Sequence, residues 1–148
     1  MMLLGLNAGL ILIGLPAPLV VDRLPELHAT LLVFGFIGSL ISLERAAALR
    51  STWALAAPLL LVVGSLLTLT ALPVAAGAWI VVAGLAVHLA QYAAIWRRQP
   101  MTATAVQALG AAVAIAAAAV WAAGAPPARL VPALATFLIL TIAGEQPA

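Results

Sequence analysis

The residues that could do chemistry are few in this chain. Cysteine is absent, which excludes disulfides, thiolate metal sites and a cysteine nucleophile, so His28 and His88 are the candidate metal or haem ligands. His28 lies two residues after Glu26. A nearby carboxylate such as Glu26 or Asp22 either orients a metal-binding imidazole or hydrogen-bonds an interfacial histidine, and the sequence leaves both readings open.

His88 belongs to a small polar cluster. The spacing of Gly84, His88, Gln91 and Tyr92 in steps of three and four places them on one face of a predicted helix. Polar groups at membrane depth need partners, so this face is expected to meet Gln107 of the next helix. His88 has three readings: a neutral imidazole bonded to a backbone carbonyl or Gln107, a haem or metal ligand, or a proton relay. The candidate cofactor-binding residues are therefore His28, His88, Gln91, Tyr92 and Gln107.

The stretch from 26 to 50 organises the chain. At about 100° per residue, one face about 60° wide carries His28, Gly35, Ser39, Ser42 and Arg45. Gly35 with Ser39 forms a pair of small residues four apart, which suits a tight helix contact. The face is either a packing seam or the lining of a ligand slot.

The composition defines the environment in which these residues must work. The 148 residues are 66% hydrophobic and 7% charged, and the mean hydropathy is +1.25, whereas soluble domains carry about 25% charge. The sequence therefore predicts an integral membrane protein whose main partner is the lipid bilayer. A net charge of +2 is no basic patch, so no nucleic-acid partner is expected. Other membrane proteins or a second copy are the remaining partners.

Prolines and charges divide the chain into helices. A crossing helix needs about 20 apolar residues, and four of the five predicted connections contain proline. We predict an all-α bundle, a single transmembrane domain over residues 1–148, with six spans at 3–21, 27–43, 53–72, 76–96, 102–123 and 130–144. The first span is expected to be retained, with a cleaved signal peptide as the alternative.

Arginines predict the orientation. The connections after spans two and four hold Arg45, Arg50, Arg97 and Arg98, against Arg23 and Arg129 on the other side. The positive-inside bias then predicts a multi-pass protein of the inner (cytoplasmic) membrane with both termini in the cytoplasm.

Counting about 1.5 Å per residue from the inner boundary gives depths. An inner polar layer about 6 to 12 Å deep is expected to contain Ser39, His88, Gln91, Gln107 and Asn7. Nearer the cytoplasmic surface are Ser42, Thr141, Glu44, Arg45 and Glu145. Glu44, Arg45 and Arg50 form either a solvated, headgroup-bound end, or a site in which an arginine pairs with Glu145 or with an acidic group of a ligand.

By the same count His28 lies about 25 Å up, at the outer surface, and about 13 Å in height from His88. His28 and His88 cannot share one metal ion, because each ligand nitrogen must come within about 2 Å of the ion. Any metal or haem sites at His28 and His88 are therefore separate.

Motifs of known chemistry are missing. There is no GxSxG, HExxH or P-loop and no carboxylate within a span core, so the sequence supports no hydrolase or nucleotide-driven reaction and leans away from an enzyme.

Two motifs carry a resemblance. The segment HATLLVFGFIGSLISLERA from His28 and the terminal FLILTIAGE resemble a family of uncharacterised bacterial polytopic membrane proteins. In that family the last motif is followed by an arginine and further sequence, so the chain resembles the N-terminal portion of a longer protein. The family is distantly similar to the NnrS group of haem- and copper-containing membrane proteins through His28 and Gly35-Phe36, which implies His28 as a ligand.

Three functions follow from these observations. The first is a membrane protein that binds a small ligand or redox cofactor within the helix bundle, with haem as the first candidate. The second is a non-catalytic accessory subunit of a larger membrane assembly. The third is a small channel or transporter fragment.

Overall fold

The computed structural model describes residues 1–18 and 22–145, and all regular structure within them is helical. The elements in chain order are α1 (Met2–Leu12), α2 (Leu24–Thr30), the π-helix η1 (Leu31–Gly38), α3 (Ser39–Leu49), η2 (Thr52–Leu55), α4 (Ala56–Leu67), α5 (Val74–Arg98), α6 (Thr102–Ala122), η3 (Pro127–Leu130) and α7 (Val131–Ala143). The prediction of an all-α chain is confirmed for the described residues. Residues 146–148, on which the expectation of a longer protein rests, lie outside them.

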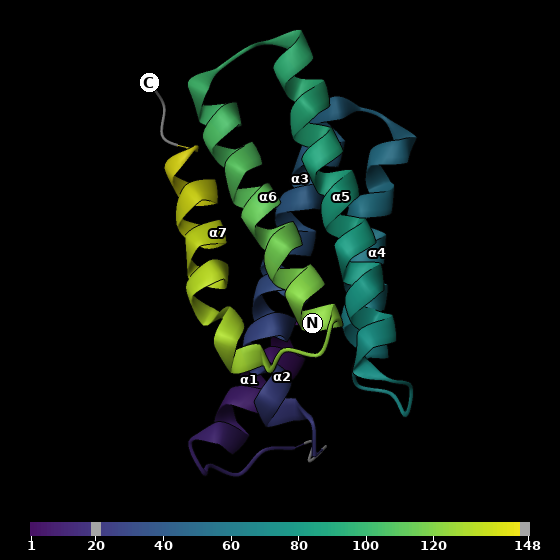
Figure 1. The fold of residues 1–148 in the computed structure, drawn as a ribbon, viewed down its shortest axis with the longest axis vertical. Helices are drawn as coiled ribbons and strands as arrows, with labels where there is room; N and C mark the ends of the chain where they lie inside the picture. The colour runs from purple at the N-terminus through teal and green to yellow at the C-terminus, as the bar shows by residue number, and fades with distance from the viewer. Residues whose placement is uncertain (19–21, 146–148) are drawn as a thin grey trace.

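The helices run up and down beside their neighbours in sequence (Figure 1). In the orientation of Figure 1, α3, α5 and α7 end at the upper end of the bundle, while α4 and α6 end at the lower end. Arg98 Nη1 donates to the Leu49 carbonyl over 3.3 Å at the upper end. Arg23 Nη1 donates to the Thr70 and Leu72 carbonyls, each over 3.2 Å, at the lower end.

Small residues let the long helices approach closely. A Cβ added to Gly64 of α4 would lie 2.8 Å from the Gly77 carbonyl oxygen of α5, so the two backbones are in contact. A Cβ on Gly110 of α6 would lie 3.3 Å from the Phe137 carbonyl oxygen of α7. The alanine-rich α6 thus packs tightly between α5 and α7.

The first helix is shorter than the expected span 3–21. α1 ends at Leu12, because Gly14 takes a positive φ of 73° and Pro16 and Pro18 follow. Residues 19–21 of that span lie outside the described part of the chain. At about 1.5 Å per residue, α1 is about 16 Å long, roughly half of a bilayer core.

α1 packs against α2 and η1, which together form the lower half of the helix from Leu24 to Leu49. Its start is at mid-height rather than at the upper end, since the Met1 side chain would be 2.6 Å from a Cβ on Gly35. Asn7 is buried between Gly5 and Gly9, which face Leu32 and His28. Asn7 therefore lies in the lower half of the bundle, beside the residues that face His28 and Leu32.

The second helix is longer than the expected span 27–43. It runs without a break from Leu24 to Leu49 over 26 residues, so Glu44 and Arg45 are helical, and it ends at Arg50 with φ of 52°. Residues 31–38 are π-helical, and a π turn holds more residues than an α turn. The expectation that His28 and Arg45 share one face, which assumed 100° per residue throughout, therefore does not hold across residues 31–38.

Three helices are long and apolar enough to cross a membrane: Leu24–Leu49, Val74–Arg98 and Thr102–Ala122. Met2–Leu12, Thr52–Leu67 and Pro127–Ala143 are shorter apolar helices. Large apolar side chains remain exposed along the bundle, with Leu59 and Ile139 each 64% exposed.

Candidate functional site

His28 is held by the backbone of α1. Its Nδ1 lies 2.7 Å from the carbonyl oxygen of Gly5. A carbonyl only accepts, so Nδ1 carries the proton and donates, and Nε2 keeps its lone pair. The expected partners, Asp22 and Glu26, do not hold this nitrogen.

Two glycines make this contact sterically feasible. A Cβ on Gly9 would lie 3.0 Å from His28 Cε1, and a Cβ on Gly5 would overlap the Leu32 side chain. The helix backbone can therefore approach the imidazole closely enough to accept its proton. Sequence reasoning missed Gly5 and Gly9, although their four-residue spacing in an apolar helix is a small-xxx-small signal.

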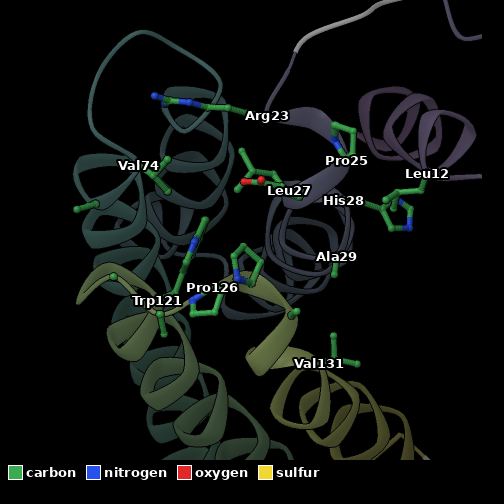
Figure 2. A pocket seen from close by; sticks show the side chains of 16 residues that line it. Leu12, Arg23, Pro25, Leu27, His28, Ala29, Val74, Trp121, Pro126 and Val131 are labelled. Atoms are coloured by element: carbon green, nitrogen blue, oxygen red, sulfur yellow. The ribbon is translucent and has the colours of Figure 1, made fainter.

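A pocket of about 780 Å³ lies beside His28 at the lower end (Figure 2). We call it the lower pocket. Figure 2 shows His28 next to Leu12 on one side, with Val74 and Trp121 on the opposite side. Apart from Arg23, Glu26 and His28, its lining residues are proline, glycine and apolar side chains, so the lower pocket is apolar with one imidazole and two charges at its margin.

His88 lies in a separate, sealed environment. Its Nδ1 is 2.8 Å from Gln91 Oε1, and Gln91 Nε2 donates to the carbonyls of Ser42 and Ala54 over 3.0 and 2.8 Å. Because both amide protons of Gln91 are used, Oε1 must accept from His88, which fixes the proton on Nδ1. His88 is thus held by Gln91, whereas the neutral reading expected a backbone carbonyl or Gln107 as its partner. Sequence reasoning did not identify Ala54 as a contact of Gln91.

Gln91 joins three segments, since it lies on α5 and reaches both α3 and η2. His88 and Gln91 are each 0% exposed. His88 Nε2 has no hydrogen-bond partner among the described residues and is buried. The Tyr92 ring packs edge-on against His88, with 4.7 Å between ring centroids.

Arg45 links this cluster to α7. Its guanidinium forms an ion pair with Glu145, and its Cζ lies 5.9 Å from the Tyr92 ring centroid. Of the two alternatives that the sequence left open for Arg45, this pairing with Glu145 corresponds to the second. Glu44, its neighbour, remains exposed.

Ser39 and Gln107 of the expected inner layer, and Ser42 beyond it, form hydrogen bonds within the protein. Ser39 Oγ donates to the Gly35 carbonyl over 2.7 Å, and Ser42 Oγ donates to the Ser39 carbonyl over 3.0 Å. Gln107 Nε2 donates to the Thr141 carbonyl over 3.3 Å, which ties α6 to α7. The hydroxyls of Ser39 and Ser42 thus donate to backbone carbonyls of their own helix.

The described residues contain no group of three or more His, Cys, Asp or Glu side chains that could hold a metal ion. His28 and His88 are thus not joined by carboxylates into a metal site, and each keeps its own surroundings.

Comparison with known proteins adds the family. A family model described as a domain of unknown function, DUF8744, matches residues 1–146. The chain belongs to this family. No curated protein and no solved structure matches it. The DUF8744 match covers both histidines, the Gln91 contacts and the Arg45–Glu145 pair, so all of these features lie within the family's domain.

Proposed function

We propose that this DUF8744 chain is an integral protein of the inner membrane. The exposed apolar side chains between the two ends support it, because water would not tolerate so large an apolar surface. The charged residues of the described chain occur near the ends of helices or in connections. In this proposal α2–η1–α3, α4, α5, α6 and α7 cross the bilayer, and α1 enters from the lower end only.

We propose further that the upper end faces the cytoplasm. Arg45, Arg50, Arg97 and Arg98 belong to that end, against Arg23 and Arg129 at the lower end. The positive-inside bias supports this orientation. The lower pocket and His28 then lie at the outer side.

The function that the geometry supports best is binding of haem in the lower pocket, where His28 would hold the iron. One observation carries the proposal: the Gly5 carbonyl accepts the Nδ1 proton of His28, so Nε2 of the neutral imidazole keeps its lone pair, and His28 is one of the residues that line the lower pocket. Ligating histidines typically donate their other ring N–H in this way. The resemblance to the NnrS group that His28 and Gly35-Phe36 suggested in the sequence would imply the same ligand.

The pocket fits a porphyrin better than a bare metal ion. A metal ion needs several protein ligands, and the described residues offer no such group. A porphyrin brings four nitrogen ligands of its own and needs only one or two from the protein. The volume of about 780 Å³ lies within the range of about 300–1,000 Å³ that is usual for small-molecule sites. A bound haem would supply one-electron or gas-binding chemistry.

His88 is a poorer ligand than His28 in this proposal. Neither of the two pockets described here is lined by His88, and its Nε2 is fully buried. A macrocycle could reach that nitrogen only if α5 separated from its neighbours. The role of His88 is to hold Gln91 in place.

An absorption spectrum of the detergent-purified protein, reconstituted with haem, tests the assignment. We expect a Soret band in the wild type that is lost in His28→Ala and kept in His88→Ala. No band in the wild type, together with metal analysis that finds no iron, would refute haem binding and leave the accessory subunit and the channel or transporter fragment as the alternatives. A band lost only in His88→Ala would move the ligand to the other histidine.

A further inference from the structure

A second cavity, of about 700 Å³, lies at the upper end of the bundle. We call it the upper pocket. It lies between α3, the α5–α6 connection, the first turns of α6 and the end of α7. Its charged and amide side chains are Glu44, Arg45, Gln107 and Glu145. It shares no lining residue with the lower pocket.

One side of the upper pocket is positive. Arg45 is mostly buried, with 19% of its side chain exposed, and its Nε–H is buried with no acceptor among the described residues. Thr102, Ala103 and Thr104 line the same cavity. They form the first turn of the 21-residue helix α6, which has no side-chain cap, so their N–H groups add to the positive potential.

Two carboxylates line the same cavity, one of them in contact with Arg45, and the walls are apolar. The carboxylates of Glu44 and Glu145 line the cavity, and Glu145 is 44% exposed although it is paired with Arg45. Ile95, Pro100 and Met101 complete the lining. A simple anion would meet two carboxylates here, and a simple cation would meet Arg45. A ligand with an anionic and a cationic group separated by a short linker satisfies both sides.

We propose that the upper pocket binds the headgroup of a phosphatidylethanolamine lipid. Its phosphodiester would face Arg45 and the start of α6, and its ammonium would face Glu44. This inference rests on the proposed membrane insertion, which puts the upper end at the depth of lipid headgroups. The primary ammonium has N–H groups that Glu44 can accept, whereas a choline headgroup has none.

Native mass spectrometry of the purified protein tests the proposal. The protein is released from micelles that contain equal amounts of phosphatidylethanolamine, phosphatidylcholine and phosphatidylglycerol. We expect preferential retention of phosphatidylethanolamine, and soluble glycerophosphoethanolamine should compete only weakly because it lacks acyl chains. Strong competition by the soluble compound would indicate a water-soluble zwitterion instead of the lipid. Equal retention of the three lipids would overturn the proposal.

Variants separate the two sides of the pocket. Glu44→Gln should lower the preference for ethanolamine over choline by about five-fold, the scale of one exposed ion pair. Arg50→Gln, an exposed arginine outside the pocket, is the control and should change nothing. An unchanged preference in Glu44→Gln would contradict the assignment of the ammonium.

A second pair of variants tests the phosphate side. Arg45→Gln and Glu145→Gln both break the same ion pair, so they share any effect on folding. Only Arg45→Gln should reduce retention of all phospholipids, while Glu145→Gln should favour phosphatidylglycerol. Equal behaviour of the two variants would refute a phosphate contact at Arg45. None of these readouts depends on haem, and a chain that stays soluble without detergent would instead refute the membrane assignment.

Discussion

At the scale of single residues, the two histidines share a tautomer but differ in access. Each donates Nδ1–H to a fixed oxygen, the Gly5 carbonyl for His28 and Gln91 Oε1 for His88. His28 lines a pocket, whereas His88 is sealed by its neighbours. The same tautomer therefore lies beside a pocket at one position and in close packing at the other.

Gln91 is the residue whose removal should cost most stability in this cluster. Gln91→Leu would leave the buried His88 Nδ1–H without its acceptor and remove two bonds to backbone carbonyls. We expect a loss of about 2 kcal/mol in the free energy of unfolding. Unfolding by denaturant in detergent, followed by tryptophan fluorescence, measures it.

Gln99→Leu is the matched control, because Gln99 is exposed just after the end of the same helix. It should leave the unfolding curve unchanged. If the two leucine variants unfold alike, Gln91 does not hold α5 to α3 and η2 in solution.

At the scale of elements, glycine contacts decide how closely the helices pack. A Cβ on Gly64 would lie 2.8 Å from both the Gly77 carbonyl oxygen and the Val81 nitrogen, which are backbone atoms that cannot rotate away. Gly64→Ala should therefore push α4 from α5, at a cost of about 2 kcal/mol. Thermal unfolding in detergent would show the change.

Gly110→Ala gives the comparison. A Cβ there meets the Leu140 side chain at 3.1 Å and the Phe137 carbonyl at 3.3 Å, so smaller shifts relieve it. We expect a clearly smaller loss than in Gly64→Ala. The reverse order would mean that α4 and α5 are less closely packed than the structure has them.

The sequence predicted some elements to within two residues and missed others. α5 and α6 begin and end close to the expected 76–96 and 102–123, because proline and arginine mark their ends. The π-helical turns of η1 have no sequence signature, and they break the 100° rule on which the single face of His28 and Arg45 depended.

Sequence spacing identified the residues of the cluster around His88, but it did not identify the backbone groups to which the candidate residues are hydrogen-bonded. Tyr92 and Gln91 follow His88 at helical spacing, which sequence periodicity detects. The Gly5 carbonyl was invisible to the same reasoning, because its position depends on where α1 ends and how it folds back. Every residue has a backbone carbonyl, so the residue type does not indicate which carbonyl accepts a hydrogen bond. Contacts of this kind can be identified only from the tertiary structure.

At the scale of the whole molecule, the distribution of arginines predicts a sidedness that can be measured. A reporter protein fused after Arg98, between α5 and α6, should be active only in the cytoplasm, because that connection lies at the end rich in arginine. A fusion after Gly124, between α6 and η3, should report the opposite side. The same signal from both fusions would contradict a crossing by α6.

The Gln91 contacts have a consequence for sequence divergence within the DUF8744 family. Gln91 binds the main chain at Ser42 and Ala54, not their side chains. Evolution can therefore exchange those two residues for any others small enough for their fully buried positions, while a change at position 91 needs a compensating change at position 88. Aligned relatives should show covariation between 88 and 91 and free drift among small residues at 42 and 54.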